Sequence, residues 1–256
     1  MSANLAELTD CIASALHFPL PTARLISRLG REREILTHGG RGRSVPKATS
    51  VDAANLLIAF MVCPTPARAT EFMKDFGDLR LSPSFMHFGD DAGPTLKRTF
   101  QPGQTFRDSI AAAIDLLGSS EFAAEFDLKA HVGDERPGDD PDVTPVIDIS
   151  IIDTYVQGEL NINGSNFHFL HPALNRTQAQ DPADDVGEAR SGIAEAALAI
   201  DHYRSPIRSE RTLEVASLLP IAELLHGRSF VSLLNERFDR EQAATVKSAE
   251  RSHAPG

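Results

Sequence analysis

Three arginines near the start of the chain have the spacing that would place their guanidinium groups on one side of a helix. Residues of an α-helix advance by about 100° each. If Pro21 opens a helix, Arg24, Arg28 and Arg31 therefore share one face, at positions i, i+4 and i+7. The apolar residues expected on the opposite face are Leu25, Ile26 and Leu29. Such a face can contact the phosphates of a nucleic acid, or it can be the solvated side of a surface helix.

A basic, glycine-rich segment follows this helix, and residues 39–43 read Gly-Gly-Arg-Gly-Arg. Because glycine tolerates positive φ, the segment can form a hairpin. It lacks the third glycine and the preceding strand of a dinucleotide-binding fingerprint. A winged helix-turn-helix contacts DNA with a helix and a neighbouring basic hairpin in this arrangement. The candidate DNA-binding residues are Thr22, Arg24, Arg28, Arg31, Arg41, Arg43 and Lys47.

The charge distribution favours a localised surface for a polyanion over a protein that coats nucleic acid. The chain of 256 residues has a net charge of −11. Between Arg24 and Lys47, seven basic and two acidic residues give +5, which leaves −16 on the remainder. An acidic remainder discourages non-specific wrapping of DNA, and it offers a surface for a protein partner.

Length and composition indicate a soluble globular protein with one large domain or two ordinary ones. The longest apolar run, residues 53–63, is too short to span a bilayer, and no secretory signal pattern is present. Cys11 and Cys63 both lie in helical apolar patterns, as expected of small core residues in a reducing compartment. We therefore expect a cytoplasmic protein without membrane association.

Hydrophobic periodicity predicts helices over most of the first 80 residues. The first covers residues 4–16 and has a Ser or Asn cap, and Pro21 suits the first turn of the second. A Thr-Ser pair with Asp52 signals the start of a third helix, over residues 49–62. A fourth helix is predicted at residues 66–79. Together these elements predict a winged helix-turn-helix domain over residues 1–80.

The rest of the chain predicts a second domain of the α+β class. A helix is predicted at residues 106–117, and β-branched and aromatic residues predict three strands, at 146–152, 155–162 and 167–170. Asn163-Gly164 is a strong signal for the hairpin that joins the last two. We expect these antiparallel strands to pack against the helix that begins at Phe106. Residues 81–104, rich in Pro, Gly and Asp, are predicted to be a linker, 105–240 the α+β domain and 241–256 a flexible tail.

One resemblance rests on three motifs: Pro21-Thr22-Ala23-Arg24, the Gly-Gly-Arg-Gly-Arg run, and Thr49-x-x-Asp52-Ala53-Ala54-Asn55-Leu56-Leu57. With these motifs, residues 5–79 resemble the N-terminal helix-turn-helix segment of uncharacterised bacterial phage and prophage proteins. The segment is more loosely similar to the MerR type of winged helix. The resemblance implies that Thr22, Arg24 and Arg28 face DNA from the helix, with Arg41 and Arg43 in the wing. The chain departs from the MerR type at Leu25 and Ile26, where that type carries aromatic residues, and in having no sustained heptad for a dimerising helix.

The sequence shows no enzyme motif. It has no Gly-x-Ser-x-Gly elbow, no phosphate-binding loop and no His-Glu-x-x-His helix. His168 and His171, with Asp148 or Asp153 near, form the one metal-like group, but residues three apart on a strand point to opposite faces. The aspartates of residues 139–142 lack the glycine and the closing glutamate of a calcium loop. We therefore predict no enzymatic activity, no cofactor and no metal.

These observations predict a sequence-specific DNA-binding protein, most simply a phage-related transcriptional regulator that acts on double-stranded DNA. Because one module binds weakly, specificity requires a homodimer or another homo-oligomer. The C-terminal domain is expected to supply that contact or to bind a protein partner. Two alternatives stay open: a DNA-packaging or virion-assembly component, and a protein-interaction module whose basic face meets an acidic partner without binding DNA.

Overall fold

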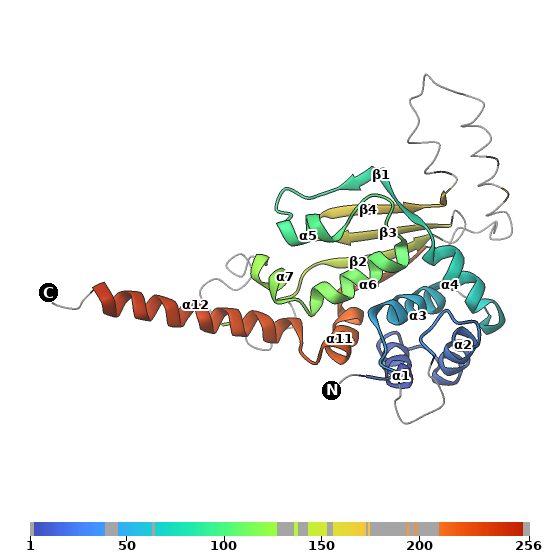
Figure 1. Ribbon diagram of the computed structural model, residues 1–256, viewed down its shortest axis with the longest axis horizontal. Coiled ribbons are helices and arrows are strands. Elements are labelled where there is room, and N and C mark those ends of the chain that lie inside the picture. Colours follow the sequence, from blue (N-terminus) through green and yellow to red (C-terminus); the bar gives the residue numbers. More distant parts are fainter. Residues whose placement is uncertain are drawn as a thin grey trace, which may run out of the picture.

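The computed structural model describes residues 3–38, 46–62, 65–126, 136–137, 143–152, 156–172, 174, 194, 198 and 210–252. These parts form an α+β architecture, in which helices surround one face of a five-stranded antiparallel sheet (Figure 1). The predicted α+β class is therefore confirmed. In the described parts, no helix has both the length and the apolar character needed to cross a bilayer.

The N-terminal helices match the sequence prediction closely. They are α1 (Leu5–Ala15), α2 (Leu20–Glu32), α3 (Ser50–Val62), the 3-10 helix η1 (Pro66–Arg68) and α4 (Ala69–Gly77). A capping box starts α1: the side chain of Asn4 accepts hydrogen bonds from the backbone of Ala6 and Glu7, and the Glu7 carboxylate accepts one from the backbone N–H of Asn4. Pro21 lies in the first turn of α2, where its missing N–H costs no hydrogen bond.

Helix α3 is the most extensively buried of the N-terminal helices. Val51 in its first turn is exposed, but every residue from 52 to 62 is buried. A helix that is apolar on all sides is buried on all sides. Accordingly, α3 packs against α1, α2, α4 and two helices introduced below, α6 and α11 (Figure 1).

The sheet has the strand order β1-β4-β3-β2-β5. Its strands are β1 (Arg80–His87), β2 (Ile147–Ile152), β3 (Gln157–Ile162), β4 (Ser165–Leu170) and β5 (Glu210–Glu214). The predicted hairpin between β3 and β4 is confirmed, because Asn163 and Gly164 both have positive φ, at 48° and 77°. The three predicted strands are also confirmed, whereas β1 and β5 were not predicted.

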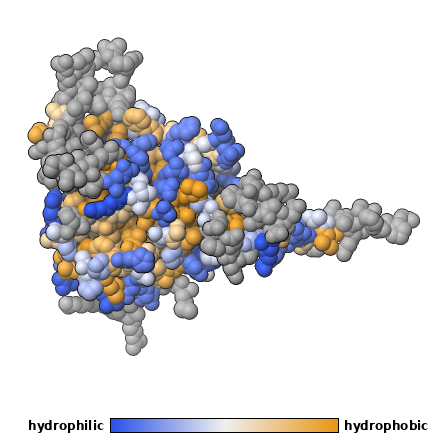
Figure 2. Space-filling view, turned by 180° about the vertical axis from the view of Figure 1, so that it is seen from behind, coloured by the Kyte–Doolittle hydropathy of each residue, from blue (hydrophilic) through white to orange (hydrophobic). Residues whose placement is uncertain are grey.

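The two faces of the sheet differ. One face is covered by α5 (Pro94–Thr99) and α6 (Phe106–Leu117) (Figure 1), and phenylalanine rings of the strands pack against those at the helix ends there. The Phe106 ring lies 4.9 Å from that of Phe169, and a Cβ atom on Gly158 would lie only 2.8 Å from the Phe106 ring. The predicted packing of the strands against the helix at Phe106 is thus confirmed. The opposite side, seen from behind in Figure 2, has hydrophilic residues gathered in part of its upper half, beside hydrophobic ones.

Residues 81–104, for which the sequence predicted a linker, are instead an integral part of the fold. They contain most of β1 and all of α5. Leu81, Leu96 and Phe100 belong to the same hydrophobic cluster as Leu5 of α1 and residues of the last helix. Pro83 is tolerated because β1 is an edge strand with a register shift between Leu81 and Met86.

Helices also form much of the described C-terminal part. It holds α7 (Ser120–Glu125), α11 (Val215–His226) and α12 (Phe230–Ser252). Pro220 lies inside α11, which continues through it without a break. Helix α12 continues to Ser252, so the tail predicted from residue 241 begins inside a helix that extends away from the body (Figure 1). The Arg237 guanidinium anchors it by donating to the carbonyl oxygens of Ala123 and Phe126.

Candidate nucleic-acid interface

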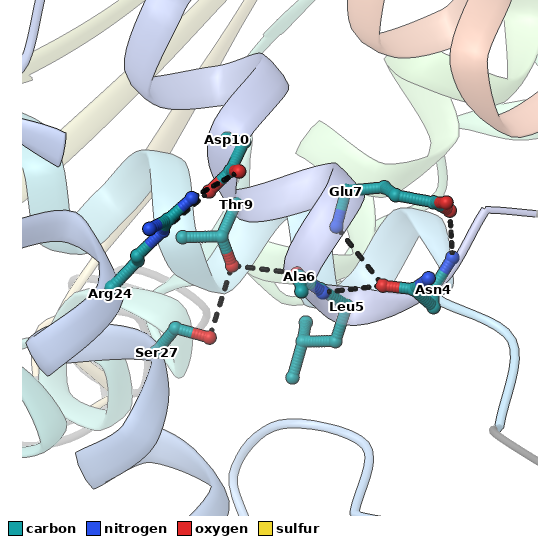
Figure 3. A network of polar contacts seen from close by, with 8 residues as sticks. All are labelled: Asn4, Leu5, Ala6, Glu7, Thr9, Asp10, Arg24 and Ser27. Carbon is teal, nitrogen blue, oxygen red and sulfur yellow. Dashed lines mark hydrogen bonds and ion pairs between the residues drawn. The ribbon is translucent and has the colours of Figure 1, made fainter.

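The packing of α1 against α2 determines which side of α2 meets solvent. The hydroxyl oxygens of Thr9 and Ser27 lie 3.0 Å apart in the buried contact, and the Thr9 hydroxyl also donates to the carbonyl oxygen of Leu5 (Figure 3). The inward residues of α2 follow a spacing of three and four, and they are Ala23, Ile26, Ser27 and Gly30. Because these residues are buried, the opposite side of α2 faces outward.

The outward side of α2 carries the three arginines that the sequence placed on one face. Arg24, Arg28 and Arg31 are all exposed, and Thr22 is half-buried. The predicted apolar face is only partly correct. Ile26 is buried, but Leu29 is half-buried and Leu25 is 37% exposed. Leu25 lies next to Arg24 and Arg28 in the helical projection, so the arginine face includes an exposed apolar side chain.

Arg24 is held by a carboxylate from α1, Asp10, which no motif of the sequence indicates. Its Nε atom lies 3.0 Å from Oδ1 of Asp10, and its Nη2 atom lies 2.7 Å from Oδ2 (Figure 3). The two side chains are 60% and 41% exposed. The hydrogen bonds from Arg24 lower the pKa of Asp10, and the same bonds raise the pKa of Arg24. Arg24 is therefore not a free cation in this state.

The other two arginines of α2 are less constrained. Nε of Arg28 lies 3.6 Å from Oε1 of Glu32, one turn further along, and both side chains are about 60% exposed. Such an exposed i, i+4 pair is weak and screened by salt. Within the described residues, Arg31 makes no ion pair. Arg28 and Arg31 thus remain accessible to an anionic ligand.

Lys47 lies at the same end of the helix pair as Arg31. It forms an antiparallel bridge with Asn4, at the start of α1. The contacts of Thr9 with Ser27 and of Asp10 with Arg24 show that α1 and α2 pack antiparallel to each other. The start of α1 therefore lies level with the last turn of α2.

The predicted wing and its residues Arg41 and Arg43 lie outside the described residues. The chain on either side of them is well anchored. On one side, Thr37 donates from its backbone N–H and its hydroxyl to the buried carboxylate of Asp52. On the other, Lys47 bridges to Asn4, and the backbone N–H of Ala48 donates to the carbonyl oxygen of Ala3. Both anchors lie beside the C-terminal end of α2.

A second polar surface lies on the open face of the sheet. There a groove of about 220 Å³ is lined by residues of four strands, namely Asp148, Ser150, Glu159, Leu160, Asn161, Asn166, Phe167, His168 and Thr212. Nδ1 of His168 lies 3.2 Å from Oε1 of Glu159, and the His168 ring lies 5.8 Å from that of Phe85. The hydroxyl oxygens of Ser150 and Thr212 lie 2.8 Å apart.

The strand register at this groove does not activate Ser150 as a nucleophile. Glu159 is the cross-strand partner of both Ser150 and His168, so it lies between them. Ser150 is instead bonded to Thr212, whereas an activated serine needs a base within hydrogen-bond reach. The described residues contain no group of three potential metal ligands, and Nδ1 of His168, one of the predicted metal-like pair, lies beside the Glu159 carboxylate. Asp153 lies outside the described residues.

The sequence thus located the cationic face but missed its carboxylate partners. The Arg28–Glu32 pair could have been found from its i, i+4 spacing, whereas the Arg24–Asp10 pair depends on how α1 crosses α2. Comparisons of the chain with known protein families, with curated proteins and with solved structures found no match.

Proposed function

We propose that the chain binds double-stranded DNA sequence-specifically through the outward face of α2, as a transcriptional regulator. The observation that carries the proposal is the shared exposed face of Arg24, Arg28 and Arg31, with Lys47 at the end of the same helix. In this arrangement Thr22, Arg24 and Arg28 approach the groove, and Arg28 also meets a phosphate at its edge. The other residues that bind phosphates are Arg31, Arg41, Arg43 and Lys47.

In this proposal the DNA contacts a local cationic surface on a protein whose net charge is negative. Each phosphate that a cation neutralises releases counterions, so about five contacts give a log–log salt slope of about −4 to −5. One module supplies weak binding, and a homodimer that reads two half-sites would supply specificity. The phage relationship rests on the resemblance of residues 5–79. Light scattering distinguishes a dimeric regulator from the ring-shaped assembly of a packaging component.

The test is fluorescence anisotropy of a labelled random-sequence duplex with the full chain across a salt series. Replacing Arg28 and Arg31 together by Ala should remove two phosphate contacts, lower affinity at least tenfold at low salt, and flatten the salt slope by about 1.8. The matched control replaces two exposed arginines of α5 and α12, Arg98 and Arg240, and should leave both quantities unchanged. No duplex binding by the unmodified chain, or an equal loss in the control, contradicts the proposal.

A second candidate is a protein-interaction module, and one specific observation favours it. Leu20 and Leu25 of α2 are each 37% exposed beside the arginines, which gives this helix a mixed apolar and cationic surface. Such a surface would suit an acidic amphipathic helix of a partner. The candidate would replace the first if the chain bound no duplex at low salt but bound an acidic amphipathic peptide, with loss of binding on Arg28→Ala and Arg31→Ala.

A further inference from the structure

Arg24 differs from its neighbours on α2 because a carboxylate of another helix takes two of its donors. The Nε and Nη2 atoms both donate to Asp10, at 3.0 and 2.7 Å. This is the two-bond fork that a guanidinium also uses to bind a phosphate. Asp10 thus occupies on Arg24 the position that a phosphate would take.

We propose that Asp10 is an internal competitor of nucleic-acid phosphate for Arg24. The inference rests on the proposed DNA-binding function and concerns the regulation of that site. In the unmodified chain, Arg24 approaches the groove while it stays bonded to Asp10, so the α2 face makes one phosphate contact fewer than it could. Loss of the Asp10 charge releases Arg24 to make an additional phosphate contact.

Because both side chains are exposed, a phosphate can compete with Asp10 for Arg24. Asp10 is 41% exposed and Arg24 is 60% exposed, so solvent and ligands reach both groups. Exposed ion pairs contribute little free energy and are screened by salt. The carboxylate therefore weakens binding by a small factor and does not prevent it.

The Asp10–Arg24 pair is not needed to hold α1 against α2. The Thr9–Ser27 contact lies in the buried interface, and Ile12, Ala23 and Ile26 are buried there too. Apolar burial of this kind dominates the free energy of helix packing. A variant at Asp10 should therefore keep the fold, which a melting curve by circular dichroism would check.

The experiment compares the full chain with Asp10→Asn, which keeps the side-chain shape and removes the charge. The probe is a labelled random-sequence duplex, titrated across a salt series. We expect the variant to bind roughly two- to fivefold more tightly. Its salt slope should be steeper by about 0.9, the value for one added phosphate contact.

Two controls distinguish competition by Asp10 for Arg24 from the change in net charge that Asp10→Asn also causes. Glu34→Gln removes the same charge from an exposed residue just beyond α2 and should have a smaller effect on affinity and slope. In an Arg24→Gln background, Asp10→Asn should give no gain, since Asp10 acts through Arg24. An equal effect of Glu34→Gln, or a gain that persists without Arg24, overturns the inference. Duplex binding that Asp10→Asn leaves unchanged overturns only this inference, whereas absence of binding in every variant overturns the proposed function as well.

Discussion

Asp52 shows how one side chain can fix both a helix and the segment that precedes it. Its carboxylate accepts hydrogen bonds from the backbone N–H and the hydroxyl of Thr37 and from the same two groups of Thr49, at 2.7 to 2.9 Å. Asp52 is 2% exposed. Because all four donors point at this carboxylate, it caps α3 and holds the chain at the start of the predicted wing.

Asp52→Asn should therefore destabilise the protein although it changes the side-chain shape very little. The amide nitrogen would face donors in place of an acceptor, and at least one buried donor would lose its partner. We expect the free energy of unfolding to fall by about 1–3 kcal/mol, measured by denaturant titration. Asp91→Asn, at an exposed turn position, is the matched control and should change it by less than about 0.5 kcal/mol. An equally small effect at Asp52 would contradict this assignment.

The Arg24–Asp10 pair fixes the pH range over which competition for Arg24 operates. Arg24 lowers the pKa of Asp10, so the carboxylate stays charged throughout the neutral range. The pair's contribution is present above the ordinary aspartate pKa and is lost only as pH falls through the lowered one. The raised pKa of Arg24 keeps it charged at every pH where the protein is studied. The gain from Asp10→Asn should therefore be constant between about pH 6 and pH 9.

Among the strands, the β2–β5 pairing carries an electrostatic conflict. Asp148 and Glu214 are direct cross-strand partners, so their carboxylates share the open face of the sheet. Like charges in directly opposite positions destabilise a sheet. The next pair along the same face, Ser150 with Thr212, is instead bonded hydroxyl to hydroxyl.

Asp148→Asn should accordingly stabilise the protein, because it removes the repulsion and keeps a polar side chain at the solvated face. We expect the free energy of unfolding to rise by about 0.2–1 kcal/mol and the rise to shrink at high salt. Circular dichroism of chemical unfolding at two salt concentrations measures both effects. A loss of stability would show that the Asp148 carboxylate is compensated by a partner.

The elements that could be predicted from sequence are those set by neighbouring residues. The helix from Phe106 to Leu117 and the Asn163-Gly164 hairpin follow from local periodicity and turn chemistry, and both were found at the expected positions. Strand β1 contains Pro83 and a register shift, so its alternation is broken, and its pairing with β4 depends on residues 79 to 90 positions away. The candidate site shows the same contrast. The shared face of the three arginines follows from their spacing within one helix, whereas the contact between Arg24 and Asp10 depends on how two helices pack.

On the scale of the whole molecule, the largest difference from the sequence-based prediction concerns its division into two domains. Helix α3, from the first predicted domain, packs against α6 and α11 of the second. One hydrophobic cluster includes Leu5 near the start of the chain and Leu234 in α12. A change in composition, such as the Pro- and Gly-rich stretch of residues 81–104, marks irregular backbone but carries no information on which apolar surfaces meet.

A shared core predicts that the described parts of the protein unfold together. We expect calorimetry to show one transition whose calorimetric and van't Hoff enthalpies agree. Leu57→Ala in the centre of α3 should cost about 2–5 kcal/mol. It should lower hydrogen-exchange protection equally in α1 and in the distant strand β3, because both would open in the same global event. Two separable transitions, with the protection of β3 unaffected by Leu57→Ala, would instead establish two independent domains. The helices that carry the arginine face would then fold and unfold independently of the sheet.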